Sequence, residues 1–197
     1  MKMLLIAPIS NNGISAREEI AKIRSHLTEP PIVITDPATT QADIATIASG
    51  HKFDVIHFAA HGNADGIHLP NGLMDLEALA RLVKNSGAKL VFLNACESVI
   101  PMQIIYDAGA KTVIAHASEA LDTEALEMAT YFYANLKSAA FADVVKAFKV
   151  IKPSDGDLIM LPGETCTPDT ELSKIKYGQI VIISVAAAQS MFWALFN

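Results

Sequence analysis

The chain has 197 residues, of which 51% are hydrophobic and 18% charged, a size and composition that suit one globular domain rather than two. The formal net charge of −6 argues against a nucleic-acid-binding protein, which needs surplus lysine and arginine to neutralise phosphates. The cysteines, Cys96 and Cys166, are too few for a disulfide framework, so we expect a reducing compartment and a free thiol. The apolar start of the chain is too short for a secretory signal, so we expect the globular part to stay in the cytoplasm.

Short apolar runs alternate with helical patterns along most of the chain, and this alternation predicts an α/β fold with a mostly parallel sheet. Strands are predicted at residues 3–8, 31–35, 54–60, 89–94 and 112–115, and helices at 15–26, 36–49, 75–85, 122–137 and 141–151. Glycines punctuate a turn region after residue 61. Residues 152–176 are rich in proline and glycine and predict a connector with an edge strand at 158–161.

The last segment, residues 177–197, contains no charged side chain. A helix of roughly 20 apolar residues spans a bilayer, and Lys174 and Lys176 precede this one as the positive-inside rule expects. The segment therefore predicts an apolar helix that anchors a cytoplasmic domain at the inner face of the cell membrane. The alternative is a buried C-terminal helix or a homo-oligomer interface, since the small residues Ser184 and Ala188 would permit close helix pairing.

His61 and Cys96 each follow an apolar strand, and functional groups of open α/β sheets collect at these carboxyl ends. If the two strands lie side by side, an imidazole and a thiol meet there. Such a pair suits acyl transfer, because the thiolate attacks a carbonyl and the imidazole handles the protons. The backbone N–H groups of Gly62 and Cys96 would then form the oxyanion hole.

Two blocks carry a resemblance to a known family: His-Phe-Ala-Ala-His-Gly at 57–62 and Leu-Val-Phe-Leu-Asn-Ala-Cys-Glu-Ser at 90–98. They resemble the catalytic blocks of the CHAT family, whose relatives include caspases and separase. The similarity continues through a strand, an acidic residue and an aromatic run, and it covers roughly residues 1–151. The chain departs from many family members after the cysteine, where Ser98 is followed by Val99 rather than by a small residue and glycine.

The resemblance implies a three-layer caspase-like sandwich at 1–151, followed by the connector at 152–176. It also implies a cysteine endopeptidase with a Cys96–His61 dyad that cleaves protein substrates without a cofactor or metal. Such relatives are often activated by a partner protein and act in prokaryotic defence or signalling. Two other functions remain open: a catalytically silent interaction module that assembles at the membrane, and a thioester-forming hydrolase or transferase acting on a non-peptide substrate.

Three acidic residues, Asp122, Glu119 and Glu97, lie nearest the expected cleft in sequence. An acid in the substrate pocket would select a basic side chain before the cleaved bond through a charge-assisted pair. Asp122 could equally be the N-cap of the helix that follows it.

The other polar residues near the dyad have simpler interpretations. His57 and His61 are four apart, but they lie in a strand and lack a carboxylate companion, which argues against zinc. His57 is expected to pack behind the dyad, on the same strand face as His61. Asn94, two residues before Cys96, either orients the site or, as we expect, only satisfies local backbone. His68 is expected to be exposed and Cys166 to be incidental.

Overall fold

The structure of the chain is a computed structural model that describes residues 1–8, 16–151 and 158–161. The predicted anchor at 177–197 and Cys166 lie outside these residues. Within the described ranges, the helices are all too short or too polar to cross a bilayer.

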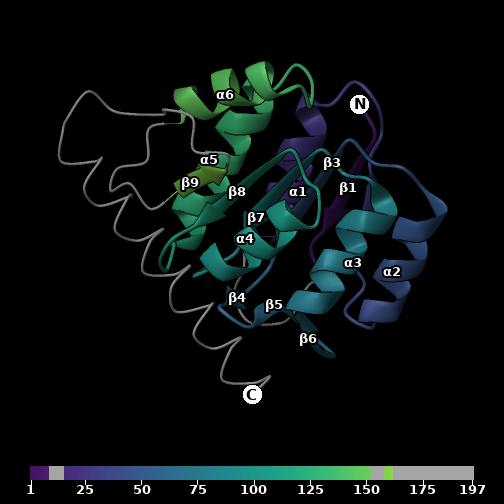
Figure 1. Ribbon diagram of the computed structural model, residues 1–197. Helices are drawn as coiled ribbons and strands as arrows, with labels where there is room; N and C mark the ends of the chain where they lie inside the picture. The colour runs from purple at the N-terminus through teal and green to yellow at the C-terminus, as the bar shows by residue number, and fades with distance from the viewer. Residues whose placement is uncertain (9–15, 152–157, 162–197) are drawn as a thin grey trace. The chain divides into compact units, whose positions relative to one another are not determined.

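A six-stranded sheet forms the centre of the fold, in the order β2-β1-β3-β7-β8-β9 (Figure 1). Five strands are parallel, and β9 runs antiparallel beside β8 at the edge. Side chains of β1, β3, β7 and β8 are buried along their whole length, as expected of parallel strands covered on both faces. The strands are β1 (Met3–Ile6), β2 (Ile32–Ile34), β3 (Val55–Ala59), β7 (Leu90–Asn94), β8 (Thr112–His116) and β9 (Leu158–Leu161).

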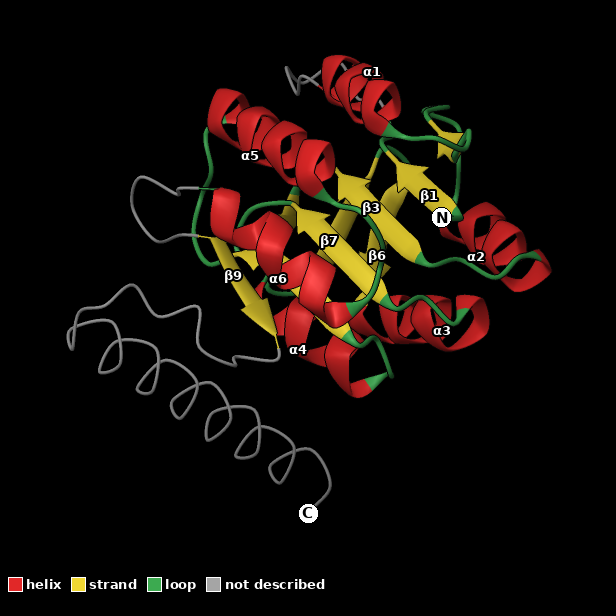
Figure 2. Cartoon of the chain, turned by 90° about the horizontal axis from the view of Figure 1, so that it is seen from above, coloured by secondary structure: helices red, strands yellow, loops and turns green. Residues whose placement is uncertain are grey.

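Helices cover both faces of this sheet, which confirms the predicted three-layer architecture. On one face α1 packs against α5 and α5 against α6, and on the other α2 packs against α3 and α3 against α4 (Figure 2). The helices are α1 (Ala16–His26), α2 (Gln41–Gly50), α3 (Leu76–Ser86), α4 (Val99–Asp107), α5 (Asp122–Asn135) and α6 (Phe141–Val150).

The strand order reverses between β1 and β3. After β1 the chain continues outward to β2, whereas after β3 it continues in the opposite direction to β7 and β8. Ligands of open α/β sheets bind at the carboxyl ends of the strands near such a reversal. A ligand site is therefore expected at the loops that follow β1, β3 and β7.

The helix predicted from residue 36 begins five residues later than expected, at Gln41. Thr40 caps it reciprocally: its hydroxyl accepts from the Asp43 N–H at 3.3 Å, and the Asp43 carboxylate accepts from the Thr40 N–H at 2.8 Å. The preceding residues form a turn closed by the Thr39 N–H on the Asp36 carbonyl. The prediction was wrong at this end because the capping box competes successfully with helical continuation.

A small sheet and a helix were not predicted. The glycine-punctuated region folds into a small antiparallel sheet of β4 (Gly62–Asn63), β5 (Gly66–Leu69) and β6 (Gly72–Asp75). Gly66 permits it, because its φ is +149° and an added Cβ would lie 2.2 Å from the Met74 carbonyl oxygen. Beyond Cys96 the chain forms α4, and Pro101 fits there because it lies in the first turn of the helix.

Candidate active site

Two adjacent strands bring His61 and Cys96 together. In the parallel pair of β3 and β7, Ala59 lies opposite Asn94, so each candidate residue stands two positions beyond this pair. The chain holds the two ends together with a hydrogen bond from the Ala60 N–H to the Asn94 carbonyl at 3.4 Å. His61 and Cys96 line the same small cavity, as expected from the placement of both residues at strand ends.

Gly62 lies in direct contact with the cysteine loop. A Cβ added at Gly62 would lie 2.9 Å from the Ala95 Cβ and 3.2 Å from the Cys96 carbonyl oxygen. Only glycine permits so close an approach of β4 to the end of β7.

Among the described residues, neither of the backbone N–H groups expected to form the oxyanion hole is used in a hydrogen bond between backbone groups. The His68 N–H donates to the His61 carbonyl at 2.9 Å, which makes His61 and His68 a hydrogen-bonded pair of the β4–β5 ladder. Because such pairs alternate, the Gly62 N–H lies outside that ladder. Within the residues that the structure describes, the Cys96 N–H also makes no hydrogen bond.

The loop carrying Cys96 is held from the end of β8. The Glu97 N–H donates to the Ser118 carbonyl at 3.1 Å, and the Ser98 N–H donates to the His116 carbonyl at 2.9 Å. Glu97 has a φ of +47°, a left-handed conformation that costs free energy for a residue with a side chain. The loop is therefore kept in a strained shape by bonds on its C-terminal side.

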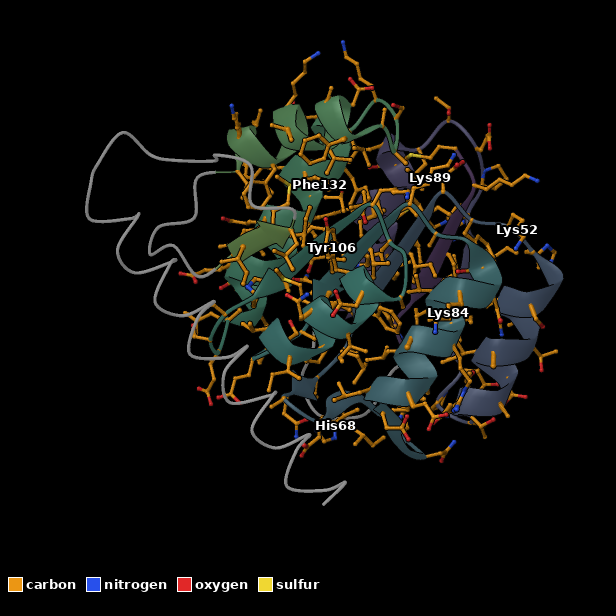
Figure 3. The ribbon with its side chains drawn as sticks, viewed as in Figure 1. Lys52, His68, Lys84, Lys89, Tyr106 and Phe132 are labelled. Carbon is orange, nitrogen blue, oxygen red and sulfur yellow. The ribbon has the colours of Figure 1, made fainter. Side chains whose placement is uncertain are left out.

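The side chains of the two candidate residues are both accessible to solvent, and no hydrogen bond joins them in the described part of the chain. The Cys96 side chain is half-buried, and its sulfur lies 3.9 Å from the Ala120 carbonyl oxygen, to which the thiol donates. The His61 ring is exposed and, in the described part of the chain, makes no side-chain hydrogen bond. His68, labelled in Figure 3, is exposed on β5 as expected.

A cavity of about 30 Å³ lies between the dyad and the interior of the protein. Its wall includes the exposed Asp122 and a buried acid, Glu19, whereas Glu97 and Glu119 are exposed and are not part of it. The N-cap of α5 is Leu121, and Asp122 is the first helical residue, so the capping interpretation of Asp122 was wrong. An acid in a first helical turn still interacts favourably with the helix dipole.

A buried hydrogen-bonded network lies behind the cavity and contributes Glu19, Asn94 and His116 to its wall. Glu19 is 4% exposed, and its Oε1 accepts from His57 Nε2 and from Asn94 Nδ2, both at 2.7 Å. His116 Nε2 lies 2.7 Å from Asn94 Oδ1, and Tyr133 Oη lies 3.2 Å from His57 Nδ1. The network joins α1, β3, β7, β8 and α5 beneath the candidate dyad.

Burial raises the pKa of the Tyr133 hydroxyl well above its ordinary value, and the Glu19 carboxylate adds to this effect. Tyr133 therefore stays protonated and can donate to His57. Its ring also packs edge-on against His57 and Phe132, at centroid distances of 5.4 and 5.1 Å. The polar network is thus enclosed by aromatic side chains.

The sequence-based interpretation missed most of this network. His57 packs behind the dyad as expected, but Asn94 binds three groups of distant elements rather than local backbone, so that expectation was wrong. Glu19 could have been recognised, because it interrupts the buried stripe of α1 formed by Ala16, Ile20 and Ile23. His116 had a weaker signal as a polar residue at the end of an apolar strand.

Other features of the described residues offer no competing catalytic site. They contain no group of three or more residues able to hold a metal ion. A larger cavity of about 470 Å³ lies between α2, α3 and the β5–β6 hairpin, but neither His61 nor Cys96 lines it. Its titratable lining residue is Arg81, which pairs with Glu77.

Comparison with the solved structure of one proteinase agrees with this architecture. The crystal structure of the Arg-specific cysteine proteinase gingipain R aligns with a TM-score of 0.58 and 16% identity, over 76% of this chain and 41% of that chain. The complex of Porphyromonas gingivalis RgpB pro- and mature domains aligns with a TM-score of 0.48 and 15% identity, over 76% of this chain and 44% of that chain. This chain therefore spans less than half of either neighbour, and no match is found among curated proteins.

The family model of the CHAT domain matches residues 9–196, almost the whole chain. The likeness to gingipain R independently shows the fold. This chain belongs to the CHAT domain family and has the α/β fold of caspase-like cysteine proteases.

Proposed function

We propose that the chain is a cysteine endopeptidase in which Cys96 is the nucleophile and His61 the proton carrier. His61 takes the proton of the Cys96 thiol, and the sulfur attacks a peptide carbonyl carbon and forms a C–S bond. The C–N bond then breaks, and His61 passes that proton to the departing amine. In the second step His61 takes a proton from a water molecule, the water oxygen attacks the thioester carbon, the C–S bond breaks, and His61 returns the proton to the Cys96 sulfur. The Gly62 and Cys96 N–H groups stabilise the negative oxygen formed in both steps.

The observation that carries this proposal is the common position of His61 and Cys96 beyond the Ala59–Asn94 pair, at one cavity. The decisive experiment compares peptide cleavage by the wild type and by Cys96→Ala and His61→Ala, with Cys166→Ala as the matched cysteine control. Each dyad variant should lose at least about 10³-fold in kcat, and Cys166→Ala should lose nothing. Cleavage by Cys96→Ala at the wild-type rate would show that the assignment is wrong.

We further propose that the substrate carries lysine or arginine before the cleaved bond. Asp122 in the cavity wall could form a charge-assisted pair with such a side chain, and the related fold of gingipain R belongs to an Arg-specific proteinase. Asp122→Asn should then raise KM for basic substrates by about 10- to 100-fold, as the loss of a hydrogen bond to a charged group implies. Glu119→Gln, outside the cavity, is the control, and equal cleavage of neutral and basic peptides would contradict the proposal.

The size of the cavity supports a requirement for activation. A volume of about 30 Å³ holds one or two water molecules and no lysine or arginine side chain. Asp122 is exposed, so a basic side chain can reach its carboxylate at the rim, but the wall that includes Ala120 must open before that side chain can enter the cavity. We propose that a partner protein drives this movement, as expected of an effector in prokaryotic defence or signalling.

The activation proposal predicts that the isolated chain reacts with a small electrophile at Cys96 but poorly with a bulky one. Iodoacetamide should alkylate Cys96, whereas a peptidyl chloromethyl ketone ending in arginine should label it slowly. Turnover of an arginine peptide by the isolated chain at an ordinary enzymatic rate of about 1 s⁻¹ or more would show that no activator is needed.

The alternative function, a catalytically silent interaction module, would leave Cys96 unreactive toward both electrophiles. A thioester-forming hydrolase or transferase would react with both but cleave no member of a peptide library.

The membrane anchor at 177–197 is a separate proposal. Fractionation of the full chain and of a chain ending at residue 176 tests it, because a full chain found only in the soluble fraction contradicts it.

A further inference from the structure

The hydrogen bonds between the side chains of the buried network beneath the dyad all donate toward Glu19. The Asn94 amide donates to Glu19, and because its oxygen faces His116 Nε2, that ring nitrogen must donate to Asn94. On the other branch the protonated Tyr133 hydroxyl donates to His57 Nδ1, so His57 Nε2 carries the hydrogen that Glu19 accepts. Both branches therefore end on the Glu19 carboxylate, which acts only as an acceptor.

Stability alone does not account for a carboxylate in this position. A charge taken out of water costs several kcal/mol, and apolar replacements of buried ion pairs are often neutral or stabilising. Glu19 nevertheless lies on the buried stripe of α1, where an apolar residue would continue the pattern of Ile20 and Ile23. What the carboxylate provides here, and an apolar side chain could not, is an acceptor for His57 and Asn94.

The members of the network stand directly behind the reactive residues. Asn94 is two residues before Cys96, and His57 is four residues before His61. Asn94 Nδ2 also donates to the Ala125 carbonyl of α5 at 3.1 Å, which ties the first turns of α5 to the end of β7.

The third strand, β8, is connected to the same network. His116 binds Asn94 through its ring, and its carbonyl oxygen accepts from the Ser98 N–H in the strained cysteine loop. A movement of Glu19 would therefore displace the loop that carries Cys96 in two ways, through Asn94 of β7 and through His116 of β8.

We propose that Glu19 is a positioning residue for the peptidase reaction: through Asn94 and His57 its carboxylate fixes the strand ends that carry Cys96 and His61. This inference rests on the proposed function. Glu19 acts as a hydrogen-bond acceptor in this role, so a glutamine, which keeps an oxygen at the same place, should largely replace it, whereas alanine should not.

The test measures kcat and KM of Glu19→Ala, Glu19→Gln and the wild type with a basic and a neutral peptide series. Glu18→Gln is the matched control, because Glu18 lies next to Glu19 on α1 but is exposed and pairs with Lys22. Glu19→Ala should lose about 10²-fold in kcat, the effect of displacing reactive groups by about 1 Å. KM should stay within about threefold in both series, and Glu19→Gln should recover most of the loss.

Two results would overturn the proposal. An unchanged kcat in folded Glu19→Ala would show that the network is only structural. A loss confined to KM for basic peptides would show that Glu19 binds the substrate itself. If Glu19→Ala does not fold, Asn94→Ala carries the same expectation, since it leaves the Glu19–His57 pair in place.

A second measurement does not depend on cleavage. In a Cys166→Ser background, Cys96 is the sole thiol, and its alkylation rate by iodoacetamide reports its position relative to His61. Glu19→Ala should slow the alkylation of Cys96 at least tenfold, and it should abolish the ring N–H signals of His57 in ¹⁵N-edited NMR spectra. Glu19→Gln should preserve the alkylation rate and these signals. If the wild type cleaves no peptide but alkylation of Cys96 still depends on Glu19, the proposed function fails and the positioning role survives. If cleavage needs Cys96 but is unchanged in Glu19→Ala, the proposed function survives and the positioning role fails.

Discussion

Replacing Gly62 with alanine tests the contact between the histidine segment and the cysteine loop. The added Cβ would lie 2.9 Å from the Ala95 Cβ, whereas nonbonded carbon atoms pack at about 3.5 Å or more. Ala95 is buried, and its Cβ cannot rotate away, so the backbones must separate by about 0.6 Å. The Cys96 carbonyl oxygen, 3.2 Å from the same position, blocks a small compensating rotation.

The expected cost follows from overpacking a close contact. Inserting a methyl group into a packed site lowers the free energy of unfolding by about 1 to 3 kcal/mol. Because the displaced atoms belong to the residues beside Cys96, kcat should fall by about tenfold or more.

The assay combines urea unfolding with peptide cleavage. Gly50→Ala is the control, since a Cβ at Gly50 meets nothing within 4 Å, and its stability should change by less than about 1 kcal/mol. In the double variant Gly62→Ala/Ala95→Gly the clashing methyl group is gone, and activity should recover relative to Gly62→Ala. If Gly62→Ala unfolds like the wild type and keeps its kcat, the contact does not constrain the site.

Two further predictions concern stability and pH. Tyr133→Phe should lose about 0.5 to 1.5 kcal/mol of unfolding free energy at neutral pH, because it removes the hydroxyl that donates to His57. The raised pKa of Tyr133 means that this advantage is complete below the ordinary tyrosine pKa of about 10 and shrinks as the pH rises above it. The free energies of unfolding of the two proteins, measured in urea, should therefore converge above that pH, and a constant gap would contradict the assignment. Asp54→Asn should cost about 0.2 to 1 kcal/mol at neutral pH, since the hydrogen bond from Lys89 Nζ at 2.7 Å lowers the pKa of this partly exposed carboxyl. The difference in unfolding free energy between Asp54→Asn and the wild type, measured in urea, should disappear as the pH falls below about 3.9 and through the lowered pKa of Asp54. A difference that persists in acid would mean that the charge of Asp54 does not cause it.

Much of the fold was predictable because its strands are buried on both faces. Apolar runs such as 89–94 leave few alternatives to a central parallel strand, and the helices between them follow from their spacing. The small sheet of β4, β5 and β6 was not predictable in this way, since its strands are short and depend on a glycine that meets the Met74 backbone. The same holds for α4, whose sequence Val-Ile-Pro resembles a helix breaker until its place in the first turn is known.

The sequence by itself determined the candidate dyad. His61 and Cys96 follow apolar strands, and their neighbouring residues match a family pattern that covers almost the whole chain. These are local properties, because a strand end and a short motif are both written in consecutive residues.

Only the tertiary structure decided what surrounds the dyad. Glu19 reaches Asn94 across 75 positions of sequence and His57 across 38, and no local pattern pairs a carboxylate with partners at such distances. The volume of the cavity likewise depends on how α1, α5 and three strands pack together. Burial gives these polar groups their importance, because a carboxylate excluded from water must find donors wherever the fold brings them.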